Sequence, residues 1–171
     1  MYRIYQNIIP HSPIGDEMSE LADYERDIAS HFGWTLLSPK ERGNGLTCKA
    51  PDGAMIALRF DWASMDTGNH YLEVECRENR ESPWKASGFG IARKKADYWV
   101  VVNEHDVYVA DVKNIVKMLK KKRGDLDDHV SRRNLDDYEK RMYARGHLVP
   151  LEFLEPCCHV ICASPVKSPE I

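Results

Sequence analysis

A chain of 171 residues is long enough for one domain with a substantial core and too short for two domains of ordinary size. Its hydrophobic fraction of 43% and charged fraction of 30% are those of a globular protein, which excludes a disordered or fibrous chain. The net charge of −3 does not by itself indicate a nucleic-acid binder, but acids are dense in 16–27 and 125–137 and bases in 77–95 and 113–123, which indicates a polarised surface.

Three features bear on the cellular location. No apolar run approaches the roughly 20 residues of a membrane helix. The first residues, MYRIYQNIIPHSP, lack the succession of charged, apolar and small residues that marks a signal peptide. Five cysteines, an odd number, argue against a secreted disulfide framework. We therefore expect a cytoplasmic protein with reduced thiols and no association with membranes.

The N-terminal part should form a helix followed by a meander of strands. Residues 14–32 begin after Pro13 with acidic residues and end before Gly33, as helices do. Apolar residues recur there at intervals of three or four and give one apolar face: Leu21, Tyr24, Ile28 and Phe32. Strands are predicted at 34–37, 46–50 and 54–60, because Gly-Asn-Gly and Pro-Asp-Gly turn signals separate these runs. We expect an antiparallel meander that ends at Asp61.

The middle of the chain is predicted to contain a loop, two strands and a short helix. The loop, over 62–70, carries the turn signal Thr-Gly-Asn. In the strand 71–76, Glu73 and Glu75 should point to one face while Leu72 and Val74 point to the other. A short helix, or a loop and a helix, is expected within 81–96. The apolar run 98–102 is typical of a central strand, and we expect it beside the strand of Glu73.

The C-terminal part is predicted as a strand at 107–110, a helix at 112–122 between an Asp111 N-cap and Gly124, and a charged loop or lid at 124–145. Residues 147–154 should dock on the domain. Residues 157–162 offer three thiols and an imidazole, which are ligands for Zn²⁺, but adjacent cysteines fit a tetrahedral site poorly and a terminal strand is the better interpretation. We expect a single domain over 1–163 and a flexible tail over 164–171.

Three carboxylates are the main candidates for chemistry. Asp61 ends one predicted strand and Glu73 and Glu75 lie on the next, so a hairpin-like pairing would bring them within a few ångströms of one another. Two carboxylates on one strand face repel each other unless a cation or a proton intervenes. Such oxygen ligands suit Mg²⁺ or Mn²⁺, and a bound ion would polarise a phosphodiester and help to generate hydroxide. The sequence therefore predicts a metal site for hydrolysis.

This arrangement resembles the PD-(D/E)xK nuclease superfamily, in particular its small phage and bacterial Holliday-junction-resolvase-like or restriction-endonuclease-like members. In that family an aspartate ends the second core strand and an acid follows on the third, and Asp61 and Glu73 match these positions. Residues 67–69, 87–88 and 96–99 are similar to a recurrent phage subset. Glu25, which precedes a Gly-aromatic pair, is similar to a glutamate in the first helix of resolvase-like members. The resemblance spans residues 24–102, with a weaker likeness in 147–154.

The resemblance implies an α/β fold with an αβββαβ restriction-endonuclease-like core, in which a mixed central sheet is flanked by helices. It implies a Mg²⁺- or Mn²⁺-dependent endonuclease that hydrolyses DNA, selective for branched DNA such as Holliday junctions, and acting as a homodimer in the cytoplasm of a bacterial or phage-infected cell. Asp61, Glu73 and the backbone carbonyl of Val74 would hold the metal, Glu75 would position water or a second ion, and Glu25 would assist. The basic residues expected to contact DNA are Arg77, Arg80, Lys85, Arg93, Lys94, Lys117 and Lys121.

One position departs from the family. Its lysine belongs two residues after Glu73, where this chain has Glu75. Some members substitute glutamate or carry the lysine on the following helix, where Lys85, Lys94 or Lys95 would stabilise the charge that develops on the phosphorus.

Other interpretations stay open. A Glu-x-Glu pair is common on solvated sheet faces, and Glu25 fits a solvated helix face. His70 beside the turn is either a general base or an exposed loop residue, and the basic run 117–123 is either a solubilising helix end or a phosphate contact. The alternative class of function is a catalytically inactive protein of nuclease fold that binds nucleic acid or a protein partner.

Overall fold

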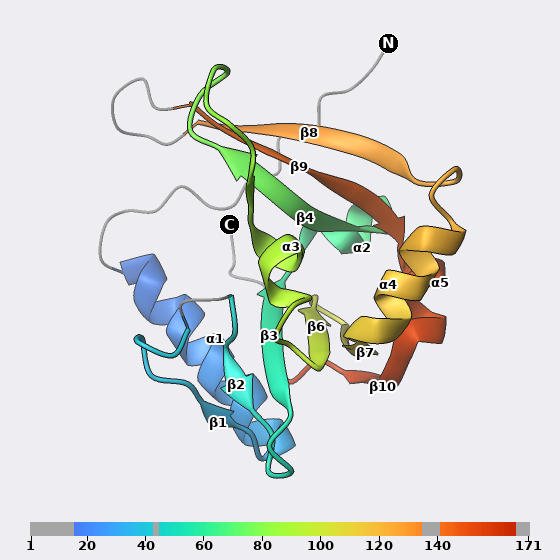
Figure 1. Cartoon of the computed structure of the whole chain (residues 1–171). Helices are drawn as coiled ribbons and strands as arrows, with labels where there is room; N and C mark the ends of the chain where they lie inside the picture. Colours follow the sequence, from blue (N-terminus) through green and yellow to red (C-terminus); the bar gives the residue numbers. More distant parts are fainter. Residues whose placement is uncertain (1–15, 43–44, 135–140, 167–171) are drawn as a thin grey trace.

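The structure is a computed structural model that describes residues 16–42, 45–134 and 141–166, and its architecture is mixed α/β with two sheets (Figure 1). Sheet A has the strand order β1-β2-β3-β6-β7-β10, and sheet B the order β5-β4-β9-β8. The strands of sheet A are β1 Thr35–Leu36, β2 Cys48–Lys49, β3 Met55–Phe60, β6 Tyr98–Val102, β7 Asp106–Asp111 and β10 Cys158–Ala163. Those of sheet B are β4 Asn69–Arg77, β5 Lys85–Ala86, β8 Asp127–Asn134 and β9 Arg141–Pro150.

Sheet A begins with the predicted meander. Strands β1, β2 and β3 pair antiparallel in sequence and lead to Asp61, which confirms that prediction. Strand β6 pairs parallel with β3 and antiparallel with β7, so the sheet is mixed. The predicted adjacency of 98–102 to the strand of Glu73 is wrong, because that strand belongs to sheet B. The apolar run of β6 is instead buried on both faces of sheet A, as suits a central strand.

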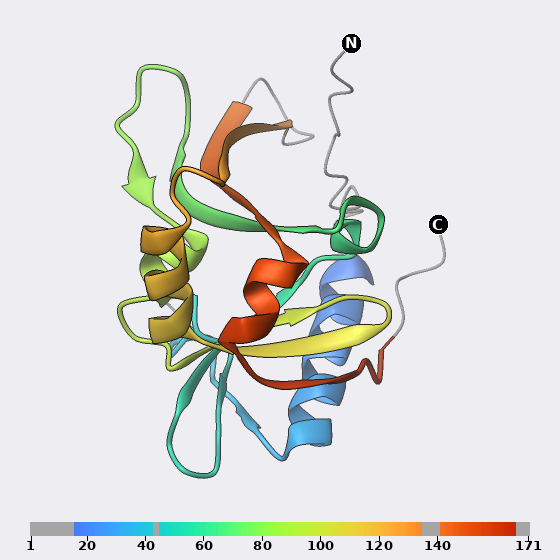
Figure 2. The same cartoon turned by 90° about the vertical axis from the view of Figure 1, so that its right-hand side faces the viewer.

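The two faces of sheet A carry different helices. Alternate residues of β3 and β6, Leu58 and Val100 among them, pack with Ile28 of α1 (Asp16–Phe32). Their neighbours, including Trp99 and Val101, pack on the other face with α3 (Gly88–Ala92) and α4 (Val112–Lys121). Figure 2 shows α1 and α4 on opposite sides of the sheet. The period of two in the strands therefore builds two cores.

The helices α1 and α4 confirm the sequence signals at their ends. Gly33 follows α1 with φ of 67°, a left-handed conformation that glycine adopts at little cost. The carboxylate of Asp111 accepts from the backbone N–H groups of Lys113 and Asn114 at 2.8 and 3.1 Å, so it is the N-cap of α4. Part of the loop predicted over 62–70 is the short helix α2 (Ala63–Thr67), which ends at Gly68.

Most of the loop or lid predicted over 124–145 is wrong, because β8 and the start of β9 lie within it and pair with each other; residues 135–140 lie outside the described part. Strand β9 also pairs with β4 and buries Ala144 and Gly146, which are too small to give an apolar pattern in the sequence.

The C-terminal segment packs on sheet A. After α5 (Leu151–Leu154) and a 3-10 turn (Glu155–Cys157), β10 confirms the predicted terminal strand. The predicted tail begins later than expected, since Val166 is buried; residues 167–171 lie outside the described part. None of the helices in the described ranges combines the length and apolarity needed to cross a membrane.

Candidate functional site

The carboxylate of Asp61 lies where the two sheets meet. Asp61 follows β3, and its N–H donates to the Val102 carbonyl oxygen at 2.8 Å in sheet A. Its Oδ2 accepts from His70 Nδ1 at 2.6 Å and from the Tyr71 backbone N–H at 3.2 Å, and both of these residues belong to β4. The side chain of Asp61 is only 15% exposed. This carboxylate therefore joins the end of β3 to the start of β4.

His70 extends the link to a third strand. It is 2% exposed, and its Nε2 accepts from the indole N–H of Trp99 on β6 at 3.0 Å. Because an indole nitrogen can only donate, the hydrogen-bond network assigns the ring proton to Nδ1, and the contact with Asp61 is a hydrogen bond rather than an ion pair. Both ring nitrogens are occupied, so His70 is neither an exposed loop residue nor an available general base.

Glu73 and Glu75 lie on opposite faces of sheet B. Glu73 is opposite Gly146 and Glu75 is opposite Arg145, and Val74 between them is the extra residue of a bulge. Neighbouring residues of β9 face opposite ways, so their partners on β4 do so too. The prediction that the two glutamates share a face is wrong, because strict alternation fails at the bulge.

Glu75 pairs with the end of a stack of basic and aromatic side chains. Arg145 Nε donates to Glu75 Oε2 at 2.5 Å, and the Arg145 guanidinium carbon lies 4.5 Å from the centroid of the Trp84 ring. The guanidinium carbon of Arg77 lies 4.5 Å from the same ring and 5.3 Å from the ring of Tyr143. The layers thus alternate as Tyr143, Arg77, Trp84 and Arg145, and the stack holds the β4–β5 hairpin against β9.

Arg80 and Lys85 lie beside this stack. Arg80 Nε donates to the Tyr143 hydroxyl at 3.2 Å, and Lys85 Nζ lies 3.9 Å from Glu78 Oε1. Both basic side chains are exposed. The sequence analysis named the arginines of β4 and its turn but missed Trp84, Tyr143 and Arg145, because the two residues of β9 are distant in sequence and reach the hairpin of Trp84 only through strand pairing.

A second charged group surrounds Arg59 of β3. Its guanidinium lies 4.9 Å from the Trp99 ring and donates to the carbonyl oxygens of Leu58 and Gly45 at 2.6 and 3.1 Å. Burial lowers the pKa of Arg59, while the carboxylates of Glu73 and Glu25 act to raise it. Two of the predicted acids therefore act electrostatically on one half-buried arginine, Arg59, which the sequence analysis did not consider.

The predicted metal donors are not gathered. The Asp61 carboxylate is bound by His70 and Tyr71, and the carbonyl of Val74 accepts from the Ser87 N–H at 3.0 Å. Glu25 Oε2 accepts from Arg42 NH1 at 2.5 Å. Within the described ranges, no group of three or more His, Cys, Asp or Glu side chains is arranged to hold a metal ion. The donor set therefore does not fit Mg²⁺ or Mn²⁺.

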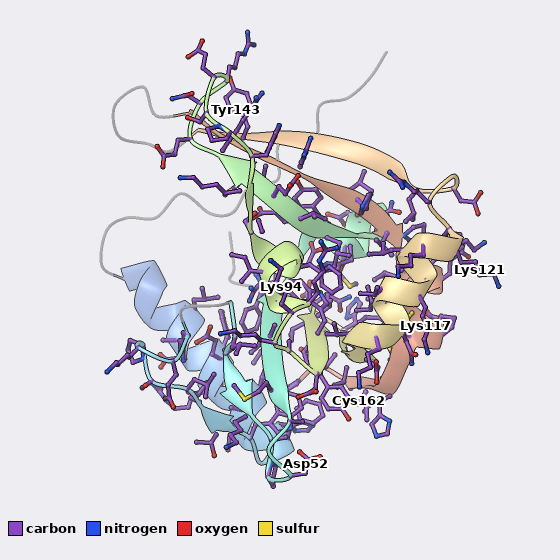
Figure 3. The ribbon with its side chains drawn as sticks, in the orientation of Figure 1. Asp52, Lys94, Lys117, Lys121, Tyr143 and Cys162 are labelled. Atoms are coloured by element: carbon purple, nitrogen blue, oxygen red, sulfur yellow. The ribbon has the colours of Figure 1, made fainter. Side chains whose placement is uncertain are left out.

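Basic side chains gather on α4 and on the turn after α3. Figure 3 shows Lys94 between the sheets in this view, and Lys117 and Lys121 along α4. Arg93, Lys94 and the two labelled lysines of α4 are exposed. Helix α4 carries no acidic residue, and the acidic side chain that caps its start, Asp111, is bound by backbone N–H groups. These residues are the part of the predicted DNA contact that the fold places on one side of sheet A.

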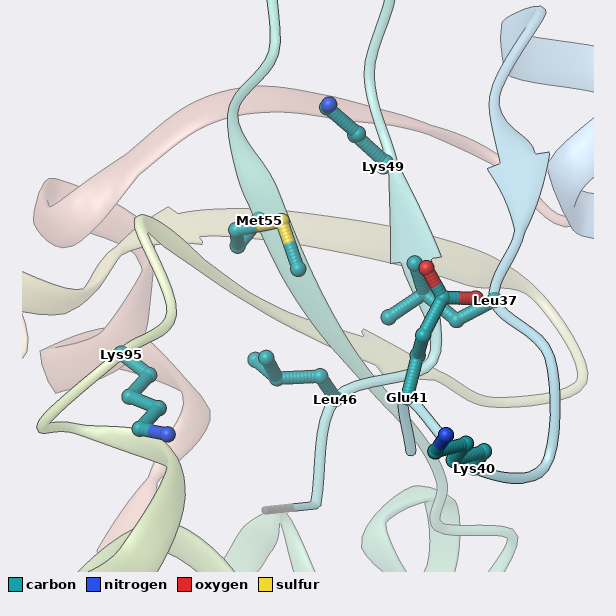
Figure 4. A pocket seen from close by; sticks show the side chains of 7 residues that line it. All are labelled: Leu37, Lys40, Glu41, Leu46, Lys49, Met55 and Lys95. Atoms are coloured by element: carbon teal, nitrogen blue, oxygen red, sulfur yellow. The ribbon is translucent and has the colours of Figure 1, made fainter. Parts of the chain in front are cut away.

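Lys95 lies at a separate hollow of about 580 Å³, which Figure 4 shows. The lysines at its rim are Lys40, Lys49 and Lys95, and its apolar lining is Leu37, Leu46 and Met55. The acid there, Glu41, accepts from the Ser38 backbone N–H at 2.9 Å, and hydrogen bonds from Ser38 lower the pKa of its carboxyl group. The hollow could hold an anion. Asp61 does not line it, so Lys95 and Asp61 do not share one site.

No protein-family model, no curated protein and no solved structure matches this chain.

Proposed function

We propose that this protein binds nucleic acid, with DNA as its partner, through the α3–α4 side of sheet A, and that it does so without metal-dependent cleavage. The observation that carries the proposal is the separation of charge across sheet A. Helix α4 and its C-cap residue hold five lysines, from Lys113 to Lys122, and no acid, whereas α1 on the opposite face holds six acids and one arginine. A polyanion approaching such a molecule is drawn to one face and repelled from the other.

The surroundings of the acids support a non-catalytic role. A metal nuclease needs carboxylates that converge on one ion. Here Asp61 joins two sheets through His70, and Glu75 pairs with Arg145. Each of these carboxylates thus has a structural partner, which removes the main reason for placing a cation between them.

The strand order supports a nuclease-like core at the level of the fold. The succession α1, β1, β2, β3, α3 and β6 follows the αβββαβ order, with α2, β4 and β5 inserted before α3. In this correspondence β3 is the third core strand, and Arg59 is its only charged residue. Asp61 ends this third strand rather than the second, so the family positions of the acids are displaced or lost.

Titration of labelled DNA with the protein tests the proposal. Fluorescence anisotropy on single-stranded, duplex and four-way-junction DNA should show binding that weakens with salt. Lys117→Gln/Lys121→Gln should make the slope of log K against log salt shallower by about 1.8 on duplex DNA, since each phosphate contact contributes about 0.9. The control Arg26→Gln removes a positive charge from α1, on the opposite face of sheet A, and should leave the slope unchanged. Equal effects of the two variants, or no binding at all, would contradict the proposal.

A Mg²⁺-dependent nuclease is the second candidate, because the positions of Asp61, Glu73 and Glu25 in the sequence resemble those of nuclease acids. The same DNA substrates, incubated with Mg²⁺ or Mn²⁺, should be bound but uncut under our proposal. Cutting that Glu73→Gln abolishes, with binding retained, would establish the nuclease instead. Calorimetric titration of Mn²⁺ into wild type and Asp61→Ala measures metal binding in the absence of DNA. Mn²⁺ binding that is lost in Asp61→Ala would support the nuclease.

A further inference from the structure

The four outer strands of the two sheets differ in how they are protected from pairing with another chain. Strands β1 and β5 are two residues long, and β5 begins with Lys85. Strand β8 has the sequence DDHVSRRN, with charges at both of its ends. Short length and charged residues are the usual protection of a sheet edge. Strand β10 has neither, since its six residues are CHVICA.

The apolar side chains of β10 are exposed. Val160 is 37% exposed and Ile161 is 46% exposed, and Leu21 is the one other large hydrophobic residue so exposed among those described. Because neighbouring residues of a strand face opposite ways, both faces of β10 present apolar surface. A bulge at His159 disturbs only the start of the strand.

The hydrogen bonds between β10 and β7 show which backbone groups of β10 face the open edge of sheet A. Ser164 N–H donates to the His105 carbonyl oxygen at 2.7 Å, next to the paired strand β7. Alternate residues of an antiparallel strand bond to the same neighbour, so Val160 and Cys162 also bond toward β7. The N–H and C=O groups of Ile161 and Ala163 therefore point away from β7, to the open edge.

We propose that β10 is a self-association surface, where a second copy of this chain pairs antiparallel and joins two copies of sheet A. A two-fold axis through Ile161 sets Ile161 against the partner's Ile161, and Cys162 against the partner's Val160. Ala163 then faces the partner's His159. A second copy fits this edge because the register brings no like charges together, whereas the uncharged strand offers nothing that would select a charged peptide.

The association should be weak. A strand pair of this length buries less than the roughly 1,200 Å² of a stable interface, so the dimer should form only at high protein concentration. The surface is separate from the basic side of α4, and the proposal does not depend on nucleic-acid binding.

Sedimentation velocity over about a hundredfold range of concentration tests the association. The wild-type sedimentation coefficient should rise with concentration. Ile161→Lys places two ammonium groups at the two-fold axis and should remain monomeric, while Ile161→Val should behave as wild type. Both variants should keep the wild-type melting temperature, because Ile161 is half exposed. A wild type that stays monomeric throughout, or that takes up only a foreign strand peptide, overturns the proposal.

A disulfide tests the register. Residues 160 and 162 of the two copies would form a pair without mutual hydrogen bonds, with Cα atoms about 4.5 Å apart, which lies within disulfide range. Val160→Cys should therefore form, on mild oxidation, a reducible dimer in which peptide mapping finds residue 160 linked to Cys162. Wild type and Val160→Cys/Cys162→Ser should not. Linkage through other cysteines, or no linkage, overturns this register.

Discussion

The hydrogen-bonded link of Asp61, His70 and Trp99 should be a large part of the stability of this fold. Replacing His70 by leucine removes its hydrogen bond to the Asp61 carboxylate, worth about 1.5–3 kcal/mol. It also leaves the buried Trp99 N–H without its acceptor, at about 1–3 kcal/mol. We expect His70→Leu to lower the free energy of unfolding by about 2.5–6 kcal/mol, out of a typical total of about 5–15 kcal/mol.

Urea and thermal unfolding at neutral pH measure this loss. The melting temperature should fall by roughly 10 °C, since each kcal/mol shifts it by about 2–4 °C in a chain of this size. His105→Leu is the matched control, because His105 is exposed and its change should stay within about 0.5 kcal/mol. In a double-mutant cycle, His70→Leu and Trp99→Phe together should cost about 1–2 kcal/mol less than the sum of the single changes.

The result that would refute this reasoning is a loss below about 1 kcal/mol for His70→Leu, or additive effects of His70→Leu and Trp99→Phe. Either result would mean that the three side chains are not coupled. Asp61 would then be available for another role, and the metal hypothesis would regain its central ligand.

Three further changes test separate features. Gly90→Ala should lower stability by about 2–4 kcal/mol by urea unfolding, because a Cβ would overlap the Val74 carbonyl oxygen, while Gly124→Ala, with open space around it, should be neutral. Burial raises the pKa of the Cys48 thiol from 9.0 to about 11, so the folded state holds this proton more tightly than the unfolded state. The free energy of unfolding therefore falls as the pH rises above 9 toward 11. Between pH 8 and 10, Cys48→Ala should lose about 1 kcal/mol less of this free energy than wild type. Trp84→Ala should cost about 1–2 kcal/mol and speed amide hydrogen exchange in β5, because Arg77 and Arg145 lose the ring between them.

The parts of the fold that the sequence predicts have local signals. The helix that ends before Gly33, the meander to Asp61 and the helix capped by Asp111 each show a period, a turn signal or a cap within a few residues. Their side chains and backbone act on near neighbours in the chain. Tertiary structure therefore changes such elements little, and the predictions agree with the fold.

The elements that the sequence analysis missed depend on distant pairing. Strand β9 lacks an apolar pattern because Ala144 and Gly146 fill its buried side, and it is stabilised by β4 and β8 rather than by its own propensity. The partner of Asp61 was missed for a similar reason. His70 follows a turn signal in the sequence, and nothing local indicates its partners. Trp99 of sheet A donates to His70 Nε2 only because the two sheets pack together in the fold.

The bulge at Val74 explains why Glu73 and Glu75 do not share a face of the sheet and why no metal ion is needed between them. The Ser87 N–H binds the carbonyl of Val74, and Gly90 packs on the same group, so α3 holds the extra residue in place. The Glu73 carboxylate acts electrostatically on Arg59 to raise its pKa, while Glu75 pairs with Arg145, and these two arginines belong to different sheets. The repulsion between Glu73 and Glu75, which motivated a metal ion in the sequence analysis, is thus relieved by two arginines. A cation at this strand would have to compete with both, and this is the physical reason for favouring a binding protein over a nuclease.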